Sequence, residues 1–237
     1  MEITPLGDSA VVVRVYDDFA SNPEAALEAV LNAQQRLEAA AIPSVVEYVA
    51  AYDSIGLFFD PAGAIEAGAS PDSILDWLKK KIFAALARPT RANKKRARSA
   101  LLEIPVCYDP EYAPDLGEVA GRSGLSIDEA VRLHRSGEYR VHCVGFVPGF
   151  PYLGGLPAEL ASPRRANPRK SVPAGSVAIG GAQTGIYPIA SPGGWNLIGR
   201  TPLRLFDPQR VPPALVARGD RVRFRSISRT EFDSWTE

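Results

Sequence analysis

Cationic side chains and glycine–proline turns gather between residues 145 and 200, where the chemistry of this sequence is expected. The stretch holds 11 of the 20 glycines and 8 of the 21 prolines in the chain. Proline fixes φ and glycine permits positive φ, so this composition predicts the rigid, irregular backbone of a preorganised ligand surface. Only one acidic residue, Glu159, accompanies the five cationic residues Arg164, Arg165, Arg169, Lys170 and Arg200.

The donors available in this stretch suit an anion. It contains neither aspartate nor histidine, so a metal would lack its usual ligands, and acid–base catalysis would lack a group that titrates near neutrality. Guanidinium groups, the amides of glycine turns and neutral polar side chains bind carboxylates and phosphates. We predict substrate- or phosphate-binding roles for nine residues: Arg164, Arg165, Arg169, Ser176, Gln183, Thr184, Ser191, Trp195 and Arg200.

The sequence leaves structural roles open for several of these residues. Arg164 and Arg165 also fit a surface loop, and Trp195 also fits a packed core. Gln183 and Thr184 also fit a turn. Arg169 follows Pro168, which constrains its backbone and favours a functional role.

Catalytic groups are not evident in the sequence. It has no GxxxxGK[ST] loop, no HExxH motif and no GxSxG elbow. His134 falls on the apolar side of a predicted helix and is interpreted as a packing residue. His142 and Cys143 are neighbours in a predicted strand, where adjacent side chains point to opposite faces, so they do not form a nucleophile pair. The stretch therefore predicts half of an anion-binding site, with its acid–base groups supplied from elsewhere.

Composition excludes several classes of protein. Of 237 residues, 46% are apolar and 23% charged, as in folded globular chains. Lys plus Arg equals Asp plus Glu at 27 each, which argues against nucleic-acid binding. No run approaches the length of a membrane span, and the two cysteines form no CxxC pair. We expect a cytoplasmic protein with reduced thiols, bound to neither membrane nor nucleic acid.

The first 106 residues alternate strand and helix patterns, with strands at 9–15, 45–49, 55–59 and 101–106 and helices at 21–41 and 70–82. Ser21 and Glu24 form a candidate capping box for the first helix. The order strand, helix, strand, strand, helix, strand predicts a ferredoxin-like βαββαβ domain. We place this α+β domain at residues 1–87. A basic linker, 88–100, which includes RPTRANKKRAR, follows it.

Residues 101–237 form the second predicted domain. Helices are expected from Pro114 to Arg122 and, after a capping box of Ser126 and Glu129, up to Gly137. Short strands with frequent glycine and proline between them predict a compact β-barrel or sandwich. These strands are expected at 177–179, 186–189, 195–198, 203–206 and 221–226.

Three strings in the glycine-rich stretch resemble a known family. They read GFVPGFPYLGGLP (145–157), PRRANPRKSVPAGSVAIGG (163–181) and QTGIYPIASPGGWNLIGRTP (183–202). The similarity extends to IPVCYDPEYAPDLGEVA (104–120) and RGDRVRF (218–224). The family is that of allophanate hydrolase subunit 1, or carboxyltransferase subdomain C and D. It includes the B subunit of bacterial ATP-dependent 5-oxoprolinase, part of urea carboxylase, and inhibitors of a sporulation histidine kinase.

The resemblance implies a fold, a reaction and partners. The implied fold is a small α+β domain followed by a cyclophilin-like β-barrel. The implied reaction is ATP-dependent cleavage of 5-oxo-L-proline to L-glutamate, with ATP shared with or bound by a partner, and with 5-oxoprolinase subunits A and C as the partners. A regulator that binds a sensor histidine kinase, or an allophanate hydrolase or urea carboxylase subunit, remains an alternative.

Overall fold

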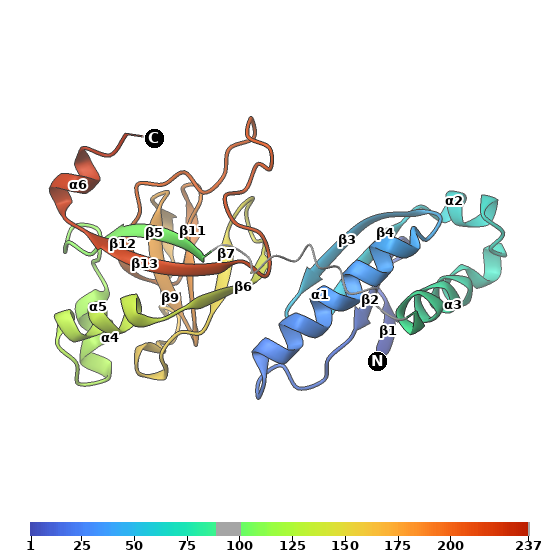
Figure 1. Ribbon diagram of the computed structural model, residues 1–237, viewed down its shortest axis with the longest axis horizontal. Coiled ribbons are helices and arrows are strands. Elements are labelled where there is room, and N and C mark those ends of the chain that lie inside the picture. The colour runs from blue at the N-terminus through green and yellow to red at the C-terminus, as the bar shows by residue number, and fades with distance from the viewer. Residues whose placement is uncertain (89–100, 237) are drawn as a thin grey trace. The chain divides into compact units, whose positions relative to one another are not determined.

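The computed structural model describes residues 1–88 and 101–236, in two compact units, Met1–Ala97 and Arg98–Glu237 (Figure 1). Each unit has its own hydrophobic core. The first combines helices with an antiparallel sheet, and the second is built on a closed barrel of seven strands. The predicted α+β class with a cyclophilin-like barrel is therefore confirmed. Apart from Arg88, the predicted basic linker 88–100 lies outside the described residues.

The N-terminal unit packs helices on one four-stranded antiparallel sheet. The sheet has the order β1-β2-β4-β3, with β1 at Glu2–Pro5, β2 at Ala10–Arg14, β3 at Val45–Ala51 and β4 at Ser54–Phe59. The helical elements are α1 (Pro23–Ala40), α2 (Pro61–Glu66), the short 3₁₀ helix η1 (Pro71–Ser73) and α3 (Ile74–Ala87). Alternate strand residues such as Val13 and Leu57 share one core with Leu37 of α1 and Leu78 of α3, all fully buried.

Three details of the predicted N-terminal domain are wrong. The fourth strand of its sheet is β1, which escaped prediction because only Ile3 of its four residues is buried. The strand predicted at 101–106 exists, but it belongs to the barrel, so βαββαβ is not the order of this sheet. An apolar pattern identifies a strand without identifying the sheet it joins. The cap of α1 also differs, since Asn22 rather than Ser21 accepts from the amide of Ala25, at 3.0 Å.

The second unit closes its barrel in the order β10-β7-β6-β13-β5-β12-β9. These strands are β5 (Leu101–Cys107), β6 (Tyr139–Val144), β7 (Pro151–Gly154), β9 (Ser176–Gly180), β10 (Gln183–Ile186), β12 (Asn196–Arg200) and β13 (Arg221–Ile227). β5 and β13, far apart in the sequence, pair in parallel from Leu101↔Arg221 to Cys107↔Ile227 and lie side by side in Figure 1. A separate two-stranded ribbon joins β8 (Arg169–Val172) to β11 (Ser191–Gly193).

Helices accompany the barrel: α4 (Leu116–Arg122), α5 (Ile127–Ser136), the 3₁₀ helix η2 (Ala158–Leu160) and α6 (Arg229–Asp233). The predicted capping box at the start of α5 is confirmed, because Ser126 and Glu129 each accept from the backbone amide of the other. The strands predicted at 177–179, 195–198 and 221–226 correspond to β9, β12 and β13. The segment 203–206 is instead irregular, with one bridge between Phe206 and Ala214.

Candidate anion-binding site

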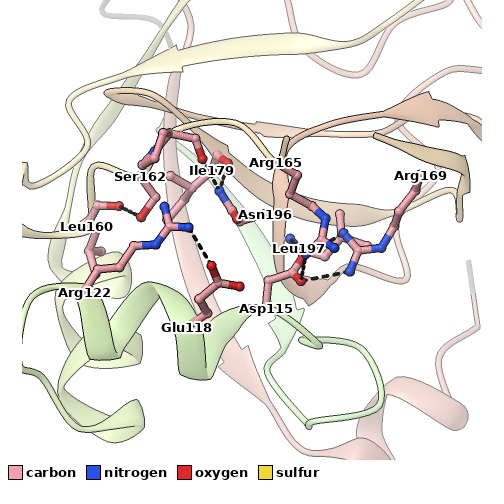
Figure 2. A network of polar contacts seen from close by, with 11 residues as sticks. Asp115, Glu118, Arg122, Leu160, Ser162, Arg165, Arg169, Ile179, Asn196 and Leu197 are labelled. Atoms are coloured by element: carbon pink, nitrogen blue, oxygen red, sulfur yellow. Dashed lines mark hydrogen bonds and ion pairs between the residues drawn. The ribbon is translucent and has the colours of Figure 1, made fainter. Parts of the chain in front are cut away.

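A buried carboxylate lies at the centre of the predicted arginine group (Figure 2). The side chain of Asp115 is 4% exposed. Nη1 of Arg165 donates to its Oδ1 at 2.7 Å, and the two Nη atoms of Arg169 donate to Oδ2 and Oδ1 at 2.8 and 2.9 Å. The backbone amide of Leu197 donates to Oδ2 at 2.7 Å. Two guanidinium groups and one amide therefore converge on a single carboxylate. We call Asp115, Arg165 and Arg169 the Asp115 cluster.

Three segments of the barrel unit build this cluster. Asp115 immediately precedes α4, and its amide donates to the carbonyl of Leu197 in β12 at 3.0 Å. Arg169 is the first residue of β8. Arg165 lies in the loop before β8, and its amide donates to the carbonyl of Gly194 at 2.7 Å. Backbone hydrogen bonds thus fix the position from which each side chain starts, and the carboxylate of Asp115 fixes the guanidinium groups at the ends of the two arginines.

The cluster has a surplus of positive charge and of donors. Two guanidinium groups face one carboxylate, so the net charge of the three residues is one positive unit. The side chains of Arg165 and Arg169 are 31% and 25% exposed, so both reach the surface. Nε of Arg165 is shielded from solvent and finds no hydrogen-bond partner among the described residues. A buried unpaired donor costs about 1–3 kcal/mol.

An aromatic group supports Arg164, one of the two predicted arginines outside the cluster. The guanidinium carbon of Arg164 lies 5.7 Å from the centre of the Trp195 ring, within the range of a cation–π contact. Trp195 is 5% exposed and packs edge-on against Phe150 at 5.5 Å. Trp195 therefore belongs to a small core and also provides a platform for Arg164.

Tyr187 links this aromatic group to the arginines electrostatically. Burial raises the pKa of the Tyr187 hydroxyl, while the positive charges of Arg164 and Arg169 act in the opposite direction. The hydroxyl also occupies the space where a β-carbon on Gly193 would lie, so glycine is required there. Tyr187 thus lies within electrostatic range of Arg164 and Arg169.

The other predicted residues have separate contacts. Nε of Arg200 donates to the carbonyl of Ala174 at 2.9 Å, and its guanidinium carbon lies 5.9 Å from the rings of Tyr112 and Phe232. Ser176 is buried and pairs with Arg200 between β9 and β12. Gln183 is half-buried at the start of β10. Ligand binding by these residues stays a prediction.

Two predicted hydroxyls lie below the surface. Thr184 is fully buried, and its Oγ1 donates to the carbonyl of Ala178 at 3.0 Å. Ser191 is 7% exposed, and its Oγ is buried without a hydrogen-bond partner among the described residues. Neither hydroxyl contacts the Asp115 cluster in any hydrogen bond of the described residues, and ligand binding by Thr184 and Ser191 stays a prediction.

Neither histidine of the chain is a base near neutrality. His134 is 1% exposed and stacks on Phe224 at 4.4 Å, which confirms its interpretation as a packing residue. Burial lowers the pKa of His134 to about 3. Burial and the charge of Arg140 lower the pKa of His142 to about 4. In the described parts of the chain no three His, Cys, Asp or Glu residues form a group that could hold a metal ion.

The barrel, the ribbon and the arginine-rich loops define a known class of domain. The chain belongs to the family of the carboxyltransferase domain, subdomain C and D, whose model matches residues 1–216. The resemblance inferred from the sequence is thereby confirmed. The chain is 39% identical over 244 residues to the 5-oxoprolinase B subunit of Bacillus subtilis strain 168, covering 100% of this chain and 97% of that protein.

Further relatives cover different shares of the chain. It is 60% identical over 126 residues to the 5-oxoprolinase B subunit of Escherichia coli O157:H7, covering 53% of this chain and 58% of that one. The solved structure of TTHA0988 superposes with a TM-score of 0.73 at 37% identity, covering 92% of this chain and 40% of that longer one. Kluyveromyces lactis urea carboxylase, at 17% identity and a TM-score of 0.72, covers 98% of this chain and 22% of the other and shows the fold alone.

Proposed function

We propose that the chain is the B subunit of a multi-subunit, ATP-dependent 5-oxoprolinase. The observation that supports this most strongly is the end-to-end similarity to the B subunit of Bacillus subtilis, which covers 100% of this chain and 97% of that protein. In this proposal subunits A and C are the partners, ATP is the co-substrate, and 5-oxo-L-proline is opened to L-glutamate with release of ADP and phosphate.

The chemistry of lactam opening fits the residues of this chain. An amide carbonyl is a poor electrophile, and transfer of the γ-phosphoryl group of ATP to its oxygen makes the carbon reactive. Water then adds to that carbon, and the ring C–N bond breaks as the nitrogen takes up a proton, which leaves the γ-acyl phosphate of L-glutamate. A second water hydrolyses this acyl phosphate to L-glutamate and inorganic phosphate. The substrate carboxylate and the phosphorylated oxygen are both anions that fixed cationic donors stabilise. Arg164, Arg165 and Arg169 are such donors.

The acid–base groups of this reaction come from partner subunits in our proposal. His134 and His142 are each 1% exposed and have pKa values lowered by burial to about 3 and about 4. Neither imidazole therefore reaches substrate or exchanges a proton near neutrality. This division of labour predicts that the isolated chain is inactive.

Reconstitution tests the proposed function. The chain is mixed with its two partner subunits, 5-oxo-L-proline and ATP, and both glutamate and phosphate are measured. We expect equal amounts of the two products from the full mixture and none when any one component is omitted. A mixture that works equally well without this chain contradicts the proposal. Urea in place of 5-oxo-L-proline serves as the control substrate, since urea carboxylase shares the fold.

A cytoplasmic location forms part of the same proposal. ATP is a cytoplasmic co-substrate, and Cys107 and Cys143 are both free thiols, as is usual for proteins of a reducing compartment. Among the described residues no helix is both long and apolar enough to cross a bilayer.

A further inference from the structure

The Asp115 cluster holds more donors than its carboxylate accepts. An ionised carboxylate offers about four acceptor positions. Four hydrogen bonds fill them, three from guanidinium groups and one from the amide of Leu197. Each guanidinium group carries more N–H bonds than it donates to Asp115. Donors of Arg165 and Arg169 therefore remain for another acceptor, on side chains that are 31% and 25% exposed.

A purely structural role explains this surplus poorly. The start of α4 is already tied to β12 by the backbone hydrogen bond from Asp115 to the carbonyl of Leu197. Arg169 alone contacts both oxygens of the carboxylate and would neutralise it. Buried ion pairs contribute little net stability, because desolvation offsets much of their attraction. The second guanidinium group, that of Arg165, adds excess positive charge at a partly exposed position instead.

We infer that Asp115 is a positioning residue, which fixes the guanidinium groups of Arg165 and Arg169 so that their remaining donors bind the carboxylate of a small substrate. The inference rests on the proposed function for the identity of that substrate, 5-oxo-L-proline. Asp115 itself does not touch the substrate. Three of its four hydrogen bonds already restrict the two arginine side chains, so less conformational entropy is lost when the substrate binds.

Charge and shape favour a carboxylate over the phosphates of a nucleotide. The cluster carries one net positive unit, which a monoanionic carboxylate neutralises and a nucleoside triphosphate exceeds several-fold. Guanidinium groups also match the planar, two-oxygen geometry of a carboxylate. We therefore assign the cluster to the substrate rather than to ATP.

The test is the effect of Asp115→Asn on each Michaelis constant of the assembled complex. We expect the KM for 5-oxo-L-proline to rise about 10- to 100-fold, the scale of losing an oriented charge-assisted hydrogen bond. The KM for ATP should change less than about two-fold, since the cluster does not contact the nucleotide. Glu118→Gln is the matched control, because it breaks an ion pair with Arg122 in the same helix where the carboxylate is 57% exposed.

Whether the KM for 5-oxo-L-proline rises or falls in Asp115→Asn distinguishes a positioning role of Asp115 from binding by net charge alone. Replacing Asp115 by asparagine raises the net charge of the cluster from one to two positive units. If charge alone bound the substrate, the KM for 5-oxo-L-proline would fall. A fall, an unchanged value, or a rise confined to the KM for ATP overturns the inference. A rise confined to 5-oxo-L-proline supports it.

Binding to the isolated full-length chain provides a second measurement that needs no activity. Side-chain ¹⁵N resonances of the arginine Nε–H groups are followed while acetate, 5-oxo-L-proline or inorganic phosphate is added. We expect the two carboxylates to shift the Arg165 resonance at lower concentration than phosphate does. Equal or stronger shifts with phosphate, or no shift with either carboxylate, overturn the inference.

The same titration covers a failure of Asp115→Asn to fold. Arg165→Lys keeps the charge and removes the planar fork, so it should weaken the carboxylate shift followed at Arg169, and an unweakened shift overturns the inference. The two proposals can also fail separately. If the reconstituted complex is inactive while this chain still shows a carboxylate shift that Asp115→Asn weakens, 5-oxo-L-proline is removed as substrate and the positioning role of Asp115 is supported.

Discussion

Two polar clusters of the barrel unit use buried groups in opposite ways. The His134 cluster consists of His134 in α5, Tyr108 and Thr184. Nδ1 of His134 lies 2.8 Å from the Tyr108 hydroxyl, and its Nε2 lies 3.2 Å from Oγ1 of Thr184. Because Thr184 donates to the carbonyl of Ala178, Nε2 is assigned as the donor to Thr184 and Nδ1 as the acceptor from Tyr108. The cluster is neutral, and each of these contacts pairs one donor with one acceptor.

The Asp115 cluster is charged, and its donors outnumber its acceptors. Its carboxylate is as buried as the His134 ring, at 4% against 1% exposure, so burial does not distinguish the two. What distinguishes them is whether unused hydrogen-bond donors remain at positions that a ligand can reach. Tyr108, His134 and Thr184 satisfy one another within the barrel unit, whereas Arg165 and Arg169 keep donors at partly exposed positions. A surplus of donors, more than burial of a charged group, marks a candidate binding site.

Acidification should produce the largest of the three predicted effects, a loss of folding stability caused by protonation of His134. The pKa of His134 is lowered to about 3 in the folded chain, against 6.5 when unfolded. The unfolded chain therefore binds the proton first, so the stability held above pH 6.5 is lost as the pH falls toward 3. Between about pH 7 and pH 4 this amounts to a loss on the order of 3 kcal/mol from this one group. Denaturant unfolding of the wild type and of His134→Gln over this range measures it.

The non-titrating variant isolates the contribution of His134 from that of His142, whose pKa burial also lowers, to about 4. We expect the unfolding free energy of His134→Gln to fall less steeply with acid than that of the wild type. Parallel curves for the two proteins would contradict the assignment of His134 as a neutral, sealed residue.

Removal of Arg169 should have the next largest effect, and on activity. Arg169→Ala deletes the guanidinium group that contacts both oxygens of Asp115. We expect kcat/KM of the assembled complex to fall about 100-fold or more, the scale of losing one preorganised charge donor. Lys170→Ala is the control, since Lys170 is the adjacent exposed cation. Equal losses from the two variants would show that general positive charge, and not the geometry of the cluster, accounts for activity.

The sequence predicted the two arginines of the Asp115 cluster but not Asp115 itself. Arg165 and Arg169 stand out because local composition is readable in a short window. Asp115 lies 50 and 54 residues earlier, outside that window, and an aspartate just before a helix usually indicates an N-cap. Asp115 makes no side-chain cap bond. Its pairing with the arginines depends on the residue before α4 lying beside both Leu197 of β12 and Arg169 of β8, which single-sequence patterns do not encode.

The fold shows the same limit. Some signals contained within one element held, as with the capping box of Ser126 and Glu129, whereas the box predicted from Ser21 and Glu24 did not, because Asn22 caps α1. The pairing of strands could not be predicted from the sequence. The sequence of β5 has the pattern of a strand, but nothing in it specifies β13 as its neighbour. The predicted ligand role of Thr184 has a similar origin, since threonine in a glycine-rich stretch looks like a surface donor until the strand that faces His134 is known.

Thr184→Val should give the smallest of the three effects and tests that last point directly. The valine keeps the shape of the side chain and removes the hydroxyl between His134 and the carbonyl of Ala178. Two buried groups then lose a partner, so we expect the free energy of unfolding to fall by about 1–3 kcal/mol. The KM for 5-oxo-L-proline in the assembled complex should stay within about two-fold, because the hydroxyl is sealed from the surface. A stable variant with a raised KM would return Thr184 to the binding site and remove the distinction between the two clusters.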